Sequence, residues 1–303
     1  MLVLARDIDA ADPKLVTRWQ EVRSRLSAVR AERPQPARDD KIVAAWNGLA
    51  VTALAEHAQL TQATTSREAA VALATVLAER HLVDGRLRRV SRDGIVGEPA
   101  GVLEDYGAVA EAFCAVHQLT GDGRWLTLAG QLLDVALEHF GTERGGFYDT
   151  ADDAEQLVTR PSDPTDNATP SGVAAVTAAL VAYAALSGET RYREAADAAF
   201  ATVGPLIASH PRFAGYSAAA AEAVVSGPYE IALVGDDPAL FAAAQRFAPA
   251  GAVIVAGRPD QEGVPLLAGR PLIDGGAAAY VCRGFVCDRP VTSAAELEEK
   301  LRG

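Results

Sequence analysis

The stretch Leu119-Thr-Gly-Asp-Gly-Arg-Trp-Leu126 decides the fold, because it places a short polar turn between two long segments rich in Ala and Leu. The stretch Leu186-Ser-Gly-Glu-Thr-Arg-Tyr-Arg193 repeats the pattern, with Gly and an acid in the turn and an aromatic residue just beyond it. Glycine and small polar residues interrupt helices, and turns this short join antiparallel helices. Both stretches therefore predict helical hairpins.

Outward from these turns, the chain from Lys41 to about Val225 has the composition of a helical array. We expect helices over residues 42–60, 66–79, 103–119, 124–140, 171–186, 191–208 and, shorter, 216–225. The connections between successive hairpins are longer, at 83–102 and 141–170. Alternation of short turns with long loops is typical of an αα-hairpin repeat, and it places all the long loops at one end of the array.

Different patterns flank this array. Pro13 begins an expected amphipathic helix, followed by a Pro-rich connector over 33–40 that cannot continue it. After Gly227 the pattern becomes strand-like over 229–234, 252–256 and 279–286, with helices over 238–247 and 293–301. We therefore expect three regions: an N-terminal arm and connector (1–40), a helical-hairpin segment (41–226) and a small α/β region (227–303).

The composition excludes several classes of function. The chain has 303 residues, 49% of them hydrophobic, which predicts a folded protein of two domains or one large one. Its net charge of -12 and pI near 4.9 give no attraction to nucleic-acid phosphates or anionic lipid. We therefore expect neither a nucleic acid nor a membrane as a partner.

The N-terminus and the cysteines bear on the compartment. A short apolar run is broken by Arg6 and Asp7, unlike a signal peptide, and no uncharged apolar stretch of about 20 residues follows, so we expect a cytoplasmic protein. An odd count of three cysteines argues against a disulfide framework. Four residues separate Cys282 from Cys287, without the spacing of a zinc or thioredoxin site, so we expect two free thiols.

Candidate functional residues gather where long loops lead into helices. Asp40, Asp105 and Asp166 each stand at such a junction, so the repeat predicts that they share one rim. Carboxylates accept hydrogen bonds from sugar hydroxyls, and aromatic rings cover the apolar faces of sugars. The sequence thus predicts a polyol-binding rim, with Asp105 and Asp166 as candidate acid–base catalysts. The expected substrate-binding residues are Asp40, Trp46, Asn47, Glu104, Tyr106, Phe147, Tyr148 and Asn167.

Each of these motifs also has a structural explanation. An acid at the start of a helix caps backbone amides and complements the helix dipole, which applies to Asp40 and to Glu104 with Asp105. Trp46 fits a core position, and Gly145-Gly-Phe-Tyr-Asp149 fits an ordinary turn. The five histidines show no metal-ligand spacing, and no G-x-G-x-x-G occurs. We therefore predict no metal and no cofactor.

At the same motifs the chain resembles the thioredoxin-domain-containing family related to spermatogenesis-associated protein 20. The resemblance rests on Arg33-Pro, Asp39-Asp-Lys41, Ala45-Trp-Asn-Gly-Leu49, Leu103-Glu-Asp-Tyr106, Gly145-Gly-Phe147, Asp166-Asn-Ala168, Pro170-Ser-Gly172, Glu230-Ile-Ala-Leu-Val-Gly235, Ala279-Tyr-Val-Cys282 and Cys287-Asp-Arg-Pro290. It implies a mainly α fold, a partial (α/α) toroid of the six-hairpin glycosidase type with a small C-terminal α/β region. Members begin with a thioredoxin-like domain and further hairpins, which we do not find in this sequence.

Two functions from different classes follow. The resemblance and the predicted rim favour a carbohydrate-active protein that binds a sugar or sugar-like metabolite, as a hydrolase or a 2-epimerase if it is an enzyme. The alternative is a non-catalytic helical scaffold that binds a protein partner. An array lacking its first hairpins leaves an apolar flank, so we expect a homodimer or a partner near the first hairpin and the N-terminal arm. A redox accessory role is disfavoured because the thioredoxin segment is not found.

Overall fold

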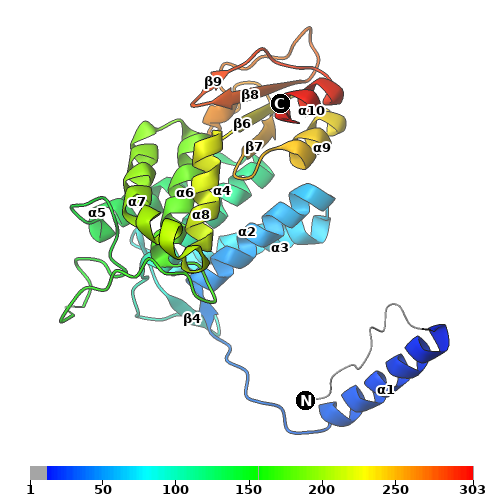
Figure 1. Cartoon of the computed structure of the whole chain (residues 1–303), viewed down its shortest axis with the longest axis vertical. Coiled ribbons are helices and arrows are strands. Elements are labelled where there is room, and N and C mark those ends of the chain that lie inside the picture. Colours follow the sequence, from blue (N-terminus) through cyan, green and yellow to red (C-terminus); the bar gives the residue numbers. More distant parts are fainter. Residues whose placement is uncertain (1–11, 156, 303) are drawn as a thin grey trace. The chain divides into compact units, whose positions relative to one another are not determined.

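The computed structural model describes residues 12–155 and 157–302, and it divides into two compact units, Met1–Asp40 and Lys41–Gly303 (Figure 1). The first unit contains α1, Pro13–Ala31, which begins at the predicted proline. The Asp12 side chain caps it by accepting a 2.8 Å hydrogen bond from the Lys14 amide. No residue from Pro13 to Ala31 is buried, so the apolar side chains of this helix lie exposed.

The helical hairpins lie in the second unit, and the prediction of their existence is confirmed. In the described part of the chain α2 (Ala44–Thr61) pairs with α3 (Thr64–Val76), α4 (Leu103–Thr120) with α5 (Gly123–Phe140), and α6 (Gly172–Ser187) with α7 (Thr190–Ser209). A further helix, α8 (Gly215–Ser226), packs on α6 and α7. The helices α2, α4, α6 and α8 form a continuous row, in which each helix packs on the next (Figure 1).

Two glycines set how closely this row of helices packs. A Cβ on Gly48 of α2 would lie 2.6 Å from the Ala108 carbonyl oxygen, so the backbones of α2 and α4 nearly touch. A Cβ on Gly107 would lie 2.4 Å from the Val176 nitrogen, which shows the same approach between α4 and α6. Helix α4 is therefore packed between α2 and α6, and it also contacts its hairpin partner α5.

The loop between the first two hairpins contains short strands that the sequence did not predict. A π-helical turn, Leu77–His81, leads into a hairpin of β2 (Leu82–Val83) and β3 (Arg86–Leu87). Strands β4 (Val90–Arg92) and β5 (Ile95–Val96) form a second hairpin, and β4 also pairs with β1 (Ile42–Val43). Elements of two or three residues carry no recognisable period, so only their Asp-Gly turns could have indicated them.

The C-terminal region is a four-stranded sheet with strand order β7-β6-β8-β9, and the predicted α/β character is confirmed. Its elements are β6 (Glu230–Val234), α9 (Pro238–Phe247), β7 (Val253–Gly257), β8 (Ala278–Arg283), β9 (Val286–Cys287) and α10 (Ala294–Arg302), with a 3-10 turn at Pro265–Leu267; another 3-10 turn, Pro211–Phe213, joins α7 to α8. Strands β6 and β7 are parallel, whereas β8 is antiparallel to β6 and to β9.

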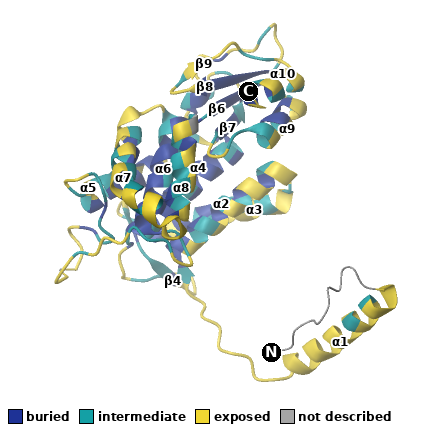
Figure 2. Cartoon of the chain, viewed as in Figure 1, coloured by how far each residue is buried: buried dark blue, intermediate teal, exposed yellow. Residues whose placement is uncertain are grey.

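The two faces of this sheet belong to different cores. Ile231 and Leu233 pack with residues of α9 and α10, whereas Ala232 and Val234, which point the other way, join the large core of the helical hairpins. Figure 2 shows buried residues running without interruption from the helices into the sheet. The change from helices to strands near residue 227 therefore lies inside one compact unit.

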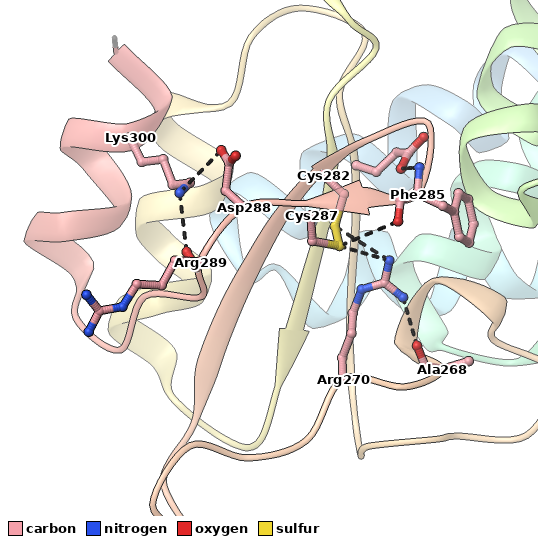
Figure 3. Close-up of a disulfide and its surroundings, with 9 residues drawn as sticks. Ala268, Arg270, Cys282, Phe285, Cys287, Asp288, Arg289 and Lys300 are labelled. Carbon is pink, nitrogen blue, oxygen red and sulfur yellow. Dashed lines mark hydrogen bonds and ion pairs between the residues drawn. A yellow bond between two sulfur atoms is a disulfide. The ribbon is translucent and has the colours of Figure 1, made fainter.

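The strand predicted over 279–286 is a hairpin instead, because Gly284 and Phe285 adopt positive φ and turn the chain between β8 and β9. This turn places Cys282 opposite Cys287, and the two form a disulfide (Figure 3). The prediction of two free thiols is therefore wrong, since a hairpin register could not be seen in the spacing alone. Among the described residues no helix is long and apolar enough to cross a membrane, and the cytoplasmic location stays a prediction.

Candidate functional site

Arg89 and two acids of α4 form a charged network where the inner helices begin. The Arg89 guanidinium lies 2.6 Å from a carboxylate oxygen of Glu104 and 2.9 Å from one of Asp105. Asp105 is fully buried and also accepts hydrogen bonds from the backbone amides of Ala45 (2.9 Å) and Val102 (3.0 Å). Burial raises the pKa of Asp105, and these amides and Arg89 oppose the rise. The Asp105 side chain thus ties the start of α2 to the start of α4.

Glu104 and Trp46 are the predicted residues that the structure brings together at an accessible surface. Trp46 is 59% exposed, the Glu104 side chain is 27% exposed, and both line a small hollow with Thr169. Its volume of about 10 Å³ holds no more than one water molecule. A sugar would therefore lie across the open face of the helices rather than inside this hollow.

Asp166 positions Tyr216, a residue that the sequence motifs did not indicate, by accepting a hydrogen bond from its amide. One of its carboxylate oxygens accepts a 2.9 Å hydrogen bond from the Ser171 amide, and the other accepts a 2.8 Å bond from the Tyr216 amide. Both oxygens are thus occupied by backbone groups of the chain. Asp166 fixes the start of α6 to the start of α8, and with it the place of Tyr216.

The hydroxyl of Tyr216 leads to a partly buried carboxylate on α4. It donates a 2.8 Å hydrogen bond to Oε2 of Glu111. Burial raises the pKa of Glu111 to about 7; the hydrogen bond from Tyr216 lowers it, and the nearby carboxylate of Glu56 on α2 raises it further. Burial also raises the pKa of Glu56. Glu111 is therefore able to take up or release a proton near neutral pH.

Three polar side chains lie along one side of α4. Glu104, Glu111 and Gln118 follow one another at intervals of seven residues, which is about two helical turns, so they project from the same side of the helix. We call Trp46, Glu56, Glu104, Glu111 and Tyr216 the inner-face cluster. The sequence motifs did not indicate Glu56, Glu111 and Tyr216, because those motifs lie in loops and at the starts of helices. The available signal was the seven-residue spacing of polar residues in the otherwise apolar helix α4.

A large cavity lies near the far end of the same helices. It has a volume of about 980 Å³, between the end of α4, the turn of the first hairpin, the end of β6 and α9. Gln118 and Gln59 line it, as do Asp236 and Phe241. The side-chain nitrogen of Gln59 is buried and has no hydrogen-bond partner within the described ranges. The cavity is large enough for a sugar-sized ligand; its carboxylates, Asp236 and Asp237, are neighbours in the sequence, and that of Asp237 caps α9.

Several predicted site residues lie elsewhere. Asp40 belongs to the first compact unit, where it forms a 2.9 Å ion pair with Arg38. Asn47 uses its side-chain amide to donate to the Val43 carbonyl, at 2.8 Å, and Asn167 is exposed in the loop before α6. The expected rim of Asp40, Asp105 and Asp166 stays a prediction, since the two compact units are not placed relative to each other.

The predicted aromatic residues of the loops have structural partners. Tyr106 and Phe147 are buried, and the Tyr106 hydroxyl accepts a 3.0 Å hydrogen bond from the Leu87 amide. The Arg160 guanidinium stacks 4.1 Å from the centre of the Tyr148 ring. The expectation that Tyr106 and Phe147 cover a ligand does not match this burial, because both rings fill the core beneath the loops.

A group of metal-ligand residue types lies on the outer side, at the end of α5. His139 Nδ1 is 2.8 Å from a carboxylate oxygen of Asp152, and Asp153 lies nearby, with one ligand atom of each within 4.8 Å of the others. Both oxygens of Asp153 are engaged by Arg86, at 2.7 and 2.8 Å. A cation at this place would have to displace that guanidinium.

No family model matches the chain. Spermatogenesis-associated protein 20 of Homo sapiens is 26% identical over 302 residues, covering 91% of this chain and 38% of the relative. The same protein of Mus musculus is 34% identical over 162 residues, covering 48% of this chain and 20% of the relative. An uncharacterized Caenorhabditis elegans protein is 26% identical over 92% of this chain and 40% of its own length.

These similarities confirm the expected resemblance to spermatogenesis-associated protein 20, and the chain spans at most about 40% of the length of these relatives. Among solved structures, cellobiose 2-epimerase from Spirochaeta thermophila has a TM-score of 0.46 at 16% identity, covering 66% of this chain and 56% of that one. A sugar epimerase from a ruminal bacterium has a TM-score of 0.49 at 10% identity, covering 57% and 46%. At these identities the likeness concerns the fold alone.

Proposed function

We propose that the inner-face cluster binds a sugar or a sugar-like polyol and that Glu111 exchanges a proton with it. The observation that carries the proposal is the hydrogen bond from Tyr216 to Glu111, made on the same side of α4 as Glu104 and beside the carboxylate of Glu56. A carboxyl group whose pKa is raised by burial and by a second carboxylate, and to which a phenol is hydrogen-bonded, is suited to general acid–base catalysis.

The chemistry of the cluster suits a polyol. Glu56, Glu104 and Glu111 provide oxygen atoms that accept hydrogen bonds from hydroxyl groups, and the exposed ring of Trp46 provides a flat apolar surface for a sugar ring. The net charge of -12 disfavours anionic ligands such as phosphorylated sugars. We therefore propose a neutral sugar as the ligand class.

In this proposal Asp105 and Asp166 hold the site in place. In each residue both carboxylate oxygens accept hydrogen bonds. The donors to Asp105 are two backbone amides and the Arg89 guanidinium, and the donors to Asp166 are two backbone amides. A carboxylate with these partners fixes the helices that carry Glu104, Glu111 and Tyr216. The acid–base role is accordingly assigned to Glu111, with Glu56 as its partner.

Two reaction classes fit such a pair, and an experiment separates them. Hydrolysis of a glycosidic bond needs a protonated carboxyl group beside the leaving oxygen and yields new reducing ends. Epimerisation at C2 needs a base that removes the proton from the carbon next to the carbonyl of the open-chain sugar. Incubation with cellobiose, glucose and mannose in deuterium oxide distinguishes them, because only the second reaction places solvent deuterium on C2.

The test of binding uses the same three sugars and saturation-transfer NMR on the full chain. We expect signal transfer to at least one sugar with the native protein, and a decrease of tenfold or more in affinity or turnover in Glu111→Gln. The control Glu68→Gln removes one carboxylate from the exposed outer helix α3 and should change neither. Absence of transfer to all three sugars, or equal behaviour of the two variants, would refute the proposal.

A further inference from the structure

A buried guanidinium lies against the disulfide of the C-terminal sheet (Figure 3). Arg270 is 6% exposed, and its Nη2 lies 3.2 Å from the sulfur of Cys287 and 3.5 Å from that of Cys282. Its Nη1 donates a 3.0 Å hydrogen bond to the Ala268 carbonyl. The guanidinium lies over the Phe285 ring, 5.6 Å from the centre of that ring.

The partners of Arg270 are weak for a buried cation. Its Nε is buried and finds no hydrogen-bond acceptor in the described part of the chain. Sulfur is a poor acceptor, and a disulfide carries no charge. Glu230 is the nearby carboxylate, but it forms no ion pair with Arg270 among the described residues and instead accepts a 2.6 Å hydrogen bond from the Phe285 amide. A buried cation normally has an anionic partner.

Reduction of the disulfide would create that partner. A thiolate on Cys287 would stand 3.2 Å from Nη2 and turn a weak contact into a charge-assisted hydrogen bond. A neighbouring cation lowers the pKa of a thiol and favours the reactive thiolate. Cys287 is partly exposed, whereas Cys282 is buried, so attack from solvent is directed to the Cys287 sulfur.

We propose that Cys282 and Cys287 form a thiol–disulfide exchange site, in which Arg270 binds the thiolate of the reduced pair. This site lies outside the inner-face cluster and does not rest on the function proposed for it. Arg270 is a positioning residue here, and the co-reactant is a dithiol, small or carried by another protein.

The disulfide is reduced in two steps. A thiolate of the dithiol attacks the Cys287 sulfur, the bond between the two cysteines breaks, and its electron pair leaves on Cys282, within 3.5 Å of Arg270. The second thiol of the reagent then attacks its own sulfur in the mixed disulfide and releases Cys287. The dithiol is oxidised to a disulfide and the protein pair is reduced. Of the two protons that the dithiol releases, one is taken up by Cys282 and the other passes to solvent, so that Cys287 remains a thiolate.

The test measures the reactivity of each cysteine in the full chain after treatment with dithiothreitol. Iodoacetamide alkylation is followed against pH by mass spectrometry, which reports Cys282 and Cys287 separately. The buried Cys114, whose pKa burial raises, serves as an internal control that should remain unmodified in the folded protein. We expect Cys287 to react at pH 7 at least tenfold faster than an ordinary thiol with a pKa of about 8.5.

Two variants separate charge from packing. Arg270→Met removes the charge and should slow the alkylation of Cys287 about tenfold at pH 7, whereas Arg270→Lys should retain most of the rate. If Arg270→Met fails to fold, the pH profile of the native chain and the Lys variant decide the matter. A disulfide that resists dithiothreitol in the folded protein, or an alkylation midpoint of Cys287 at or above 8.5, overturns the proposal.

Discussion

The hydroxyl of Tyr216 donates a 2.8 Å hydrogen bond to Glu111, although 105 residues separate the two along the chain. The bond joins α8, the last helix of the row, to the middle of α4. It is made where Glu56 of α2 also acts on Glu111, so three helices meet at one carboxyl group.

The stability of the protein should depend on the protonation of Glu111. Its pKa of about 7 in the folded state lies above that of a Glu in an unfolded chain, so the folded state binds the proton more tightly. This contribution is complete below about pH 4.5 and is lost as the pH rises to 7, by up to about 3 kcal/mol. Urea unfolding at pH 5 and pH 7.5 should show the loss in the native chain and a smaller one in Glu111→Gln. An equal pH dependence in both would contradict the raised pKa.

Replacing Tyr216 with Phe should raise the pKa of Glu111 above 7. The phenol donates to the carboxylate and stabilises its charged form, so its removal leaves burial and Glu56 acting alone. NMR titration of selectively labelled Glu side chains measures the shift directly. Tyr229→Phe, a change on the C-terminal sheet, should leave the titration as it is; a fall in the pKa of Glu111 would disprove the assigned role of Tyr216.

Asp166→Ala should destabilise the protein by about 1–3 kcal/mol, because it leaves the Ser171 and Tyr216 amides without their acceptor. Asp197→Ala serves as the comparison, since it removes an exposed carboxylate paired with Arg193 and should cost less than about 1 kcal/mol. Chemical unfolding of both variants measures the difference. Equal stabilities would show that Asp166 does not hold α8.

The close approach of the inner helices predicts opposite effects for two Gly→Ala changes. A Cβ on Gly107 would lie 2.4 Å from the Val176 nitrogen, so Gly107→Ala should force α4 and α6 apart and cost about 1–3 kcal/mol. A Cβ on Gly215, in the first turn of α8, meets nothing within 4 Å beyond its own chain neighbours. Gly215→Ala should therefore stabilise the protein, by up to about 1 kcal/mol. Melting temperatures that move in the same direction for both would refute this account.

The exposed apolar side chains of α1 favour contact with another chain. Val22 and Leu26, with Leu15 and Val29, are each more than 40% exposed, and they follow one another at spacings of seven, four and three residues. We expect concentration-dependent association of the full chain in size-exclusion chromatography with light scattering, and its loss in the double variant Val22→Glu with Leu26→Glu. Arg25→Glu changes the charge of the same helix and should not abolish association. A monomer at all micromolar concentrations would count against a partner at this helix.

The helical hairpins could be predicted because their turns contain Gly and acids at fixed places, and because long helices show their composition over many residues. The turn 121–122 and the turn 188–189 both lie where the sequence placed them. Strands β1 to β5 could not be predicted, since each has two or three residues, and β1 is held by pairing with β4, a distant segment of the chain. The π-helical end at Leu77–His81 likewise depends on contacts that sequence spacing does not show.

The candidate site was predicted in part. The loop acids were visible because they precede helices, but the sequence could not show that the carboxylates of Asp105 and Asp166 are taken up by backbone amides. Glu111 has no motif around it, and its significance comes from Tyr216, a residue of another helix. Arg270 was missed for the same reason, as only the folded sheet brings it to the two cysteines.

The sheet whose two faces join different cores also bears on the order of events during synthesis. The helical hairpins leave the ribosome before β8, yet Ala232, Val234 and Tyr280 complete the core in which these hairpins are buried. Until about residue 282 has emerged, the side of the hairpins that will receive the sheet stays uncovered. The nascent protein therefore passes through a stage with exposed apolar surface, which ends only when the strands of the sheet can pack on the hairpins.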